Sequence, residues 1–398
     1  MKEVSPTAFP NSSGGFMSDD YTAERSRIYT LKLREVLSEL PSVCSEFFRG
    51  IETTTTPLTR YGYALDLRLF MRYLICTDLC KNVESIKAID YRILDSVTPD
   101  IVEGFLEYIS LYPEENSDAD SSADDSAVFV SNGERGKARK LSSLRAFYKY
   151  LYKKGRINSN APSLVDAPKL HEKSIIRLEP DEIAKLLDLV DNGEGLTDAQ
   201  KRYHNQTKIR DAAIVTLFLG TGMRISELVG INTDDIDFEQ NEVRIVRKGG
   251  NQDILVFGSE VRSALIDYKF RRDGTETAPG HEKAFFLSMQ RKRITVRAVE
   301  QLVKKYAQLA APLKKISPHK LRSTYGTSLY RETGDIYLVA DVLGHKDVNT
   351  TRKHYAALAQ ERRRTAAEVI KLREDPAVSD LEAKTEAVPD HGNGSDEN

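Results

Sequence analysis

Residues 212–228 read AAIVTLFLGTGMRISEL, and the second half of the chain is interpreted outward from this stretch. The apolar residues predict a long helix over 208–219, and the glycines that follow predict a turn at its end. Arg224 comes directly after this turn. A lone arginine at such a place is usually a surface charge, so its meaning depends on the polar residues that accompany it further along the chain.

A β-hairpin is predicted downstream of this turn. Residues 242–247 (EVRIVR) and 252–257 (QDILVF) are rich in β-branched and aliphatic side chains, and Lys248-Gly249-Gly250-Asn251 separates them. A short glycine-containing segment between two β-rich runs is a hairpin signal. Lys248 would stand at the tip, where a lysine is most often simply solvated.

Two further sets of polar residues follow. His319 and Arg322 are three residues apart behind a Ser-Pro pair that predicts a helix start, so both would project from one side of that helix. His345 follows a Leu-Gly pair, and Tyr355 comes ten residues later. Each has an ordinary interpretation alone, since His-x-x-Arg pairs arise by chance and any of the 18 tyrosines could belong to a core.

Taken in order, these residues closely resemble the tyrosine recombinase family. Its signature is an arginine in a Thr-Gly-Leu/Met-Arg-x-x-Glu-Leu box, a hairpin lysine, a His-x-x-Arg box, a Leu-Gly-His box, and a tyrosine nine or ten residues further on. The catalytic half matches at every position, and the resemblance covers roughly residues 25–372. It is most similar to single-chain Xer-type recombinases and integrases of Gram-positive bacteria.

The resemblance implies a mainly α fold with a small antiparallel β-sheet. It implies a helical core-binding (SAM-like) DNA-binding domain at 25–166 and an α+β catalytic domain at 177–374, which together form a C-shaped clamp on DNA. Residues 167–176 read as the linker between them. The polar start, 1–24, reads as a disordered arm, and the acidic residues 375–398 read as a disordered tail.

The chemistry of cutting DNA gives these residue types a reason. A phosphodiester is cut when charge on its phosphoryl oxygens is stabilised and the leaving oxygen is protonated. The sequence has no obvious carboxylate cluster for a metal, and it offers Arg224 and Arg322, whose forked guanidinium groups suit non-bridging oxygens. The expected enzyme therefore uses neither a metal nor another cofactor.

The resemblance assigns roles to six catalytic residues: Arg224, Lys248, His319, Arg322, His345 and Tyr355. The two arginines and His345 bind the phosphate, Lys248 protonates the leaving 5′-oxygen, and His319 assists as acid and base near the nucleophile. Tyr355 attacks and forms a 3′-phosphotyrosyl link, so rejoining needs no ATP. Glu227 would either orient Arg224 or cap the turn, and the sequence does not separate these roles.

The net charge of −2 conceals a basic body. Residues 114–126 carry six acids and no base, and residues 375–398 carry seven acids and one lysine. Subtracting these two charges of −6 from the total of −2 leaves +10 for the rest of the chain. Local charge governs binding to a polyanion, so double-stranded DNA remains the expected partner. The acidic insertion at 114–126 departs from the family pattern and reads as a flexible loop.

Residues 135–156 are the expected DNA-tracking helix. They hold nine lysines and arginines and no acid, and Leu141, Leu144, Tyr148 and Leu151 form an apolar stripe at helical spacing. A solvated surface helix is the ordinary alternative, but uncompensated cations interleaved with aromatics favour phosphate contacts. The residues predicted to bind DNA are Arg135, Lys137, Arg139, Lys140, Arg145 and Lys149.

The remaining features point to a cytoplasmic protein with no membrane partner. There is no apolar run long enough to span a bilayer, and the cysteines, Cys44, Cys76 and Cys80, are too few for a disulfide framework. A structural zinc at the last two would lack further ligands nearby in sequence. An amphipathic stretch such as the one after Tyr355 ordinarily folds back onto its own core, whereas the resemblance implies that it docks on a neighbouring subunit and links four protomers.

Several alternatives stay open at this level. Type IB topoisomerases share the chemistry but act as monomers, and a binding-only regulator would have no chemical reason to keep the whole catalytic set. Within recombinases, Xer-like chromosome dimer resolution competes with integration and excision of a mobile element. The sequence does not identify the DNA target site or any accessory protein.

Overall fold

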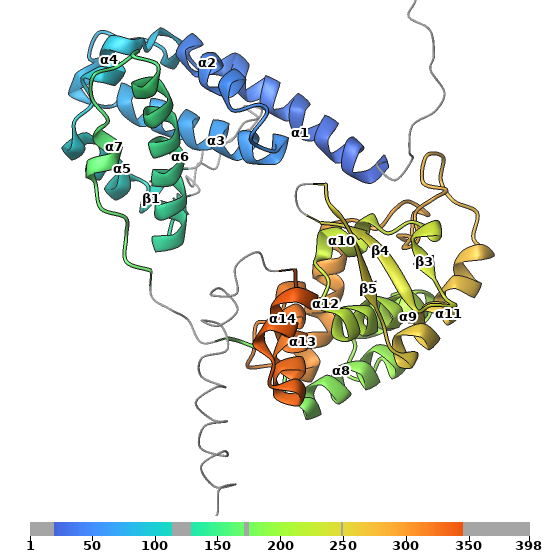
Figure 1. Cartoon of the computed structure of the whole chain (residues 1–398). Helices are drawn as coiled ribbons and strands as arrows, with labels where there is room; N and C mark the ends of the chain where they lie inside the picture. The colour runs from blue at the N-terminus through green and yellow to red at the C-terminus, as the bar shows by residue number, and fades with distance from the viewer. Residues whose placement is uncertain (1–19, 114–128, 171–174, 248–249, 345–398) are drawn as a thin grey trace, which may run out of the picture. The chain divides into compact units, whose positions relative to one another are not determined.

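The computed structural model describes residues 20–113, 129–170, 175–247 and 250–344 (Figure 1). The chain divides into two compact units, residues 1–173 and 174–398, and each is described by itself. Both are built mainly from helices, with two small antiparallel sheets among the described residues. The predicted fold class, mainly α with a small antiparallel β-sheet, is confirmed.

The first unit is a helical domain with one two-stranded sheet. Its main elements are α1 (Asp20–Glu39), α2 (Ser42–Gly50), α3 (Pro57–Ile75), α4 (Tyr91–Asp95), α5 (Pro99–Tyr108), β1 (Leu111–Pro113), β2 (Phe129–Ser131), α6 (Glu134–Lys153) and α7 (Ala161–Leu164). Strands β1 and β2 pair in antiparallel register, with Pro113 opposite Phe129. The acidic residues 114–126 fall between these two strands and lie outside the described residues.

Helix α6 contributes one face to the core of the first unit. Its predicted apolar stripe is confirmed, because Leu141, Leu144, Tyr148 and Leu151 are all fully buried. The Tyr148 hydroxyl donates to the carbonyl of Leu94, so the phenol is satisfied inside the core. Burial raises the pKa of Tyr148 well above its ordinary value. Of the basic residues on α6, Arg135 and Lys149 are exposed, whereas Lys140 is buried.

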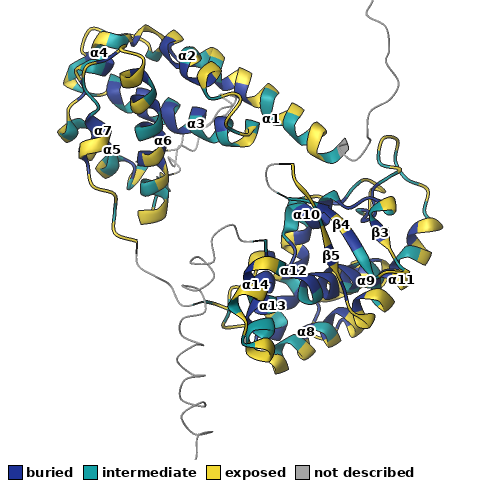
Figure 2. Cartoon of the chain, viewed as in Figure 1, coloured by how far each residue is buried: buried dark blue, intermediate teal, exposed yellow. Residues whose placement is uncertain are grey.

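The second unit surrounds a long buried helix. Its elements are α8 (Pro180–Asn192), α9 (Asp198–Thr221), α10 (Ile225–Gly230), β3 (Ile236–Asp237), β4 (Glu242–Val246), β5 (Gln252–Val256), α11 (Ser259–Asp273), α12 (Val296–Ala310), α13 (Pro318–Thr333) and α14 (Ile336–Val342). Figure 2 shows the buried colour along much of α9, on which α8, α11 and α13 pack.

The expected helix over 208–219 is the second half of α9. Thr197 caps the start of α9, and Gly222 ends it with a left-handed backbone, φ 62°. Glycine adopts this conformation without the steric penalty of a side chain. A Cβ at Gly222 would also meet the ring of Tyr325 at 2.4 Å, so the turn before Arg224 requires glycine twice over.

The predicted hairpin is formed by β4 and β5. Their register pairs Val246 with Gln252, and β3 completes a three-stranded antiparallel sheet in the order β3-β4-β5. The N–H of Arg247 donates to the carbonyl of Asn251 at 2.7 Å, which closes the turn. Lys248 lies outside the described residues. Among the described helices, none is long and apolar enough to cross a membrane.

Candidate active site

Arg224 is held by the turn that joins α9 to α10. It occupies the N-cap position of α10, and Glu227 lies one turn further along that helix. One carboxylate oxygen of Glu227 accepts the backbone N–H of Arg224 at 2.7 Å, and the other accepts its guanidinium Nη1 at 2.8 Å. Glu227 is only 4% exposed. It therefore does both things that the sequence left open: it caps the helix and orients the arginine.

Arg322 projects from α13, which begins at Pro318 behind the N-cap Ser317 as predicted. Its side chain is buried, at 4% exposure. Nη1 donates to the carbonyl of Gly222 at 2.7 Å, and Nη2 donates to the carbonyl of Leu343. These bonds connect three segments: the turn after α9, the helix α13 and the end of α14.

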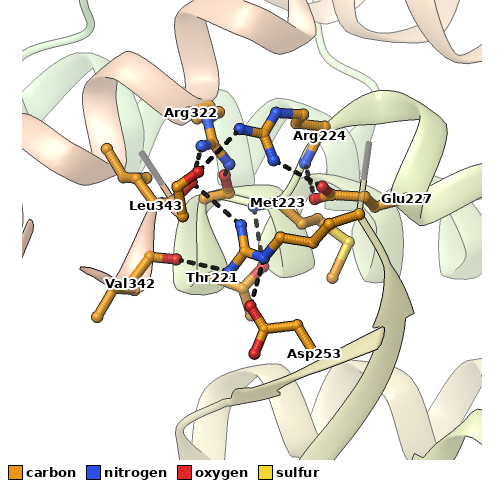
Figure 3. A network of polar contacts seen from close by, with 11 residues as sticks. Thr221, Met223, Arg224, Glu227, Asp253, Arg322, Val342 and Leu343 are labelled. Atoms are coloured by element: carbon orange, nitrogen blue, oxygen red, sulfur yellow. Dashed lines mark hydrogen bonds and ion pairs between the residues drawn. The ribbon is translucent and has the colours of Figure 1, made fainter. Parts of the chain in front are cut away.

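The two arginines meet at the carboxyl end of α14 (Figure 3). Arg224 donates through Nη2 to the carbonyl of Gly344 at 3.4 Å, and Arg322 donates to the neighbouring carbonyl of Leu343. The two residues are far apart in the sequence, yet their forks reach adjacent carbonyl oxygens. An anion with several oxygens could accept hydrogen bonds from the same two guanidinium groups. The geometry suits a phosphate better than a metal ion.

His319 lies in the first turn of α13, one turn before Arg322, and is exposed. Its carbonyl accepts the hydroxyl of Ser323 at 3.1 Å, as expected in a regular helix. The i,i+3 spacing places His319 and Arg322 on one side of α13. The structure thus brings Arg224 and Arg322 together at the end of α14 and places His319 one turn before Arg322 on α13.

Three predicted catalytic residues lie outside the described residues: Lys248, His345 and Tyr355. The chain nevertheless fixes the residues beside two of them. Arg247 precedes Lys248, and Gly344 precedes His345 with a left-handed backbone, φ 58°. The stretch after Tyr355, predicted to dock on a neighbouring subunit, also lies outside the described residues.

Sequence reasoning missed Arg247 as part of this site. Its Nη1 donates to the carbonyl of Leu343 at 3.1 Å and its Nη2 to the carbonyl of Val342 at 3.3 Å. Its Nε donates to the carboxylate of Asp253. Arg247 and Asp253 flank the predicted hairpin turn on its two strands, and this cross-strand charge pair is the signal that could have drawn attention to them.

Arg139, predicted to bind DNA, is tied to a buried carboxylate within the first unit. Its two terminal nitrogens donate to the oxygens of Asp66 at 2.5 and 2.7 Å. The hydroxyl of Ser143 donates to the same carboxylate at 2.7 Å. The Arg139 side chain is 55% exposed and that of Asp66 only 2%. Arg139 therefore compensates a buried charge, whatever else its exposed part contacts.

Two more of these residues on α6 make contacts inside the unit. Arg145 donates to the carbonyl of Pro162 at 2.9 Å and to that of Val165, which fastens α6 to α7. Lys140 is buried and donates to the side-chain oxygen of Asn132 at 2.7 Å. Burial lowers the pKa of the Lys140 ammonium.

The remaining three predicted DNA-binding residues face outward or partly outward. Arg135 and Lys149 are exposed, and Lys137 is partly exposed with its ammonium 4.0 Å from the carboxylate of Glu134. The charges of Arg135 and Lys149 are therefore open to solvent. These two residues are the strongest candidates for phosphate contacts on α6.

Comparison with known proteins agrees with this geometry. Residues 177–362 match the phage integrase family. A tyrosine recombinase XerC from Caldanaerobacter subterraneus subsp. tengcongensis is 34% identical over 343 residues, covering 82% of this chain and 87% of that protein. A tyrosine recombinase XerC from Syntrophus aciditrophicus is 35% identical over 224 residues, covering 55% of this chain and 68% of that protein.

Solved structures show the same fold. The XerH site-specific recombinase bound to a palindromic difH substrate matches with a TM-score of 0.57 at 17% identity, covering 88% of this chain and 97% of that one. A lambda integrase dimer bound to a COC′ core site matches with a TM-score of 0.53 at 16% identity, covering 79% and 94%.

The fold, the paired arginines and the extent of the XerC similarity define the class: the chain belongs to the phage integrase family of tyrosine recombinases. It is a DNA strand transferase that carries out site-specific recombination, and DNA is its partner. The resemblance first drawn from the signature residues is confirmed.

Proposed function

We propose that this recombinase cuts and rejoins DNA through a covalent link at Tyr355 and exchanges strands through a Holliday junction. The convergence of the Arg224 and Arg322 forks at the end of α14 carries the proposal. Phosphate oxygens take the place of the Leu343 and Gly344 carbonyls on these donors. Anionic oxygens are the stronger acceptors for a guanidinium group, because the attraction between opposite charges adds to the hydrogen bond.

The strand-cutting step balances with residues of this chain alone. The phenol oxygen of Tyr355 attacks phosphorus and gives its proton to His319. The bond between phosphorus and the 5′-oxygen breaks, and Lys248 protonates the leaving oxygen. Arg224, Arg322 and His345 stabilise the charge on the non-bridging oxygens. The energy of the broken bond is kept in the 3′-phosphotyrosyl link, so the reverse attack by a 5′-hydroxyl rejoins the strand without ATP.

Nearby cations explain why a tyrosine can act here. A phenol is normally protonated at neutral pH, because its pKa is about 10. Two guanidinium groups near the developing phenolate favour its charged form. His319, which is exposed and one turn from Arg322, accepts the proton in this proposal.

The variant Tyr355→Phe tests this proposal. Removing only the hydroxyl preserves folding and DNA binding and abolishes the covalent adduct. A nicked suicide substrate, incubated with EDTA and no ATP, traps the wild-type protein on the 3′-phosphate. An adduct with the phenylalanine variant, or an adduct that forms only after Mg²⁺ is added, overturns the mechanism.

The biological role proposed is Xer-like resolution of DNA dimers in the cytoplasm. The two relatives reported above are both XerC recombinases, one of them similar over most of its length. The alternative is integration and excision of a mobile element. A gene neighbourhood rich in transfer functions would favour the element, and a lone chromosomal gene would favour dimer resolution.

The proposed synaptic complex is a tetramer in which each protomer closes as a C-shaped clamp on DNA. The amphipathic sequence after Tyr355 supports it, together with the expected exchange of two duplexes. Truncation after Arg362 leaves DNA binding intact and impairs synapsis, measured by gel mobility of paired sites. A truncated protein that recombines at the wild-type rate would favour monomeric action, as in a type IB topoisomerase. A pull-down with paired DNA sites as bait would identify any accessory protein.

A further inference from the structure

Arg247 joins the β4–β5 hairpin to the carboxyl end of α14. Its terminal nitrogens donate to the carbonyls of Val342 and Leu343, and its Nε donates to Asp253 on β5. In Figure 3, Asp253 lies at the lower right of the network of polar contacts, and Val342 and Leu343 lie at its left. The Arg247 side chain is 12% exposed. A nearly buried guanidinium therefore bridges two strands and a helix end.

The contacts of Arg247 involve all three nitrogens of its guanidinium group. Its Nε edge is paired with a carboxylate, and both terminal nitrogens already have carbonyl acceptors. The approach to α14 is close, because a Cβ at Gly344 would lie 2.1 Å from Nη1 of Arg247. The residue before His345 must therefore stay a glycine for this bridge to exist.

Arg247 also starts the turn that carries Lys248. The Arg247 N–H donates to the carbonyl of Asn251, and the Arg247 carbonyl accepts the N–H of Gly250 at 3.1 Å. A two-stranded hairpin end has little stability by itself. If Arg247 is removed, the bonds that join the start of this turn to the carbonyl oxygens of Val342 and Leu343 are lost.

We propose that Arg247 is a positioning residue, which holds the turn bearing Lys248 against the phosphate site so that the leaving 5′-oxygen is protonated. This inference rests on the proposed role of Lys248. It assigns to Arg247 no contact with DNA. Asp253 supports it by neutralising the guanidinium and fixing its orientation across the hairpin.

A change of leaving group tests the inference directly. In a DNA substrate whose scissile 5′-oxygen is replaced by sulfur, the phosphorus–sulfur bond breaks and a thiolate leaves. A thiol has a pKa of about 8.5, far below that of an alcohol, so the thiolate leaves without being protonated. A defect in proton donation is then bypassed, whereas a defect in binding the phosphate persists. The variants are Arg247→Ala, Arg247→Lys, Lys248→Ala and, as a control on the exposed face of β4, Arg244→Ala.

We expect Arg247→Ala to slow single-turnover cleavage of ordinary DNA on the order of 10²-fold, the loss typical of a misplaced catalytic group, with unchanged DNA binding. On the sulfur substrate, Arg247→Ala and Lys248→Ala should both recover to within several-fold of the wild-type rate. Arg247→Lys keeps the charge but cannot bind several acceptors with a planar guanidinium group. It should therefore also be slow on ordinary DNA and recover on the sulfur substrate. Arg244→Ala should match the wild type on both substrates.

Two outcomes overturn the inference, and they differ. If Lys248→Ala recovers on the sulfur substrate while Arg247→Ala stays slow, Arg247 does not position Lys248, and the proposed function stands. If Lys248→Ala itself fails to recover, the proposed role of Lys248 is wrong, and the inference falls with it. Should Arg247→Ala fail to fold by circular dichroism, Arg247→Lys and Asp253→Asn decide between these outcomes by the same two rates.

Discussion

Arg139 in the first unit and Arg322 in the second use the same guanidinium group in opposite ways. Arg139 forks onto the carboxylate of Asp66, which is buried and also bonded by Ser143. Arg322 donates to backbone carbonyls at Gly222 and Leu343. Arg139 is half exposed although it is bonded to a buried charge, whereas Arg322 is buried beside neutral oxygens.

The difference lies in what can replace the partner. A buried carboxylate that loses its arginine is left with an uncompensated charge, so that pair holds the fold together. A carbonyl oxygen is a weaker acceptor than a phosphate oxygen, so in the proposed mechanism Arg322 and Arg224 exchange carbonyl partners for phosphate oxygens. Arg322, whose acceptors are backbone carbonyls, is thus more informative about function than Arg139, whose acceptor is a buried acid.

The variant Arg322→Lys should give the largest effect on this comparison. Lysine keeps the charge but not the fork, so we expect cleavage to slow roughly 10²- to 10³-fold, as when one transition-state donor is lost. The free energy of unfolding should change by about 1 kcal/mol. Single-turnover adduct formation and urea unfolding measure the two quantities. Unimpaired cleavage with a large loss of stability would mean that Arg322 is structural, like Arg139.

The variant Arg139→Ala should mainly affect the stability of the first unit. Asp66 would be left buried and uncompensated, at a cost of about 3 kcal/mol. Hydrogen exchange of amides in α3 and α6 should accelerate, while amides in α9 should not respond. Arg135→Ala on the same helix is the matched control, with an expected change within about 0.5 kcal/mol. If Arg139→Ala and Arg135→Ala lowered the free energy of unfolding equally, the ion pair with Asp66 would have no special role in stability.

The variants Arg135→Ala and Lys149→Ala should affect DNA binding instead. Both side chains are exposed on α6. Each lost phosphate contact should flatten the dependence of log affinity on log salt by roughly one unit of slope. Fluorescence anisotropy across a salt series measures this slope. If the slope stays as in the wild type, the DNA-contacting face of the first unit lies elsewhere.

The smallest effect is expected at His204, inside the second unit. Burial lowers the pKa of the His204 imidazole, with a further contribution from the cation of Lys305. Its Nδ1 lies 2.9 Å from the hydroxyl of Tyr306. Because the folded pKa lies below the unfolded value of about 6.5, the unfolded chain takes up a proton first as the pH falls. The stability contributed at neutral pH is therefore lost below that value, as the pH falls through the folded pKa.

The pH dependence of unfolding tests the His204 prediction. Between pH 8 and pH 5, the wild-type protein should lose more stability than His204→Gln, whatever the difference between them at pH 8. Urea titrations at several pH values give the two slopes. Parallel slopes would show that other groups cause the acid sensitivity of the second unit.

Local sequence rules predicted much of the fold. The stripe on α6, the hairpin of β4 and β5 and the start of α13 at Pro318 followed from periodicity, glycine and proline. The strands β1 and β2 were not predicted. Each has only three residues, too few to display an alternating pattern.

The site was predicted in part, and the part that was missed has a physical cause. Arg224 and Arg322 were found because each sits in a short motif with its own local signal. Arg247 was not found, because the carbonyl groups that accept its hydrogen bonds lie at the end of α14, about 95 positions away along the chain. The internal contacts of Lys140 and Arg145 were equally invisible, since a charge run does not reveal which of its members turn inward.

The pairing of Pro113 with Phe129 makes the acidic insertion a suitable site for inserting another domain. Pro113 and Phe129, the described residues on either side of this insertion, lie opposite each other in β1 and β2. The entropy of closing a loop grows only slowly with its length, by about 0.6 kcal/mol for each doubling. A fluorescent or affinity domain whose own termini are close together could therefore replace residues 114–128 at little cost to the helices on either side.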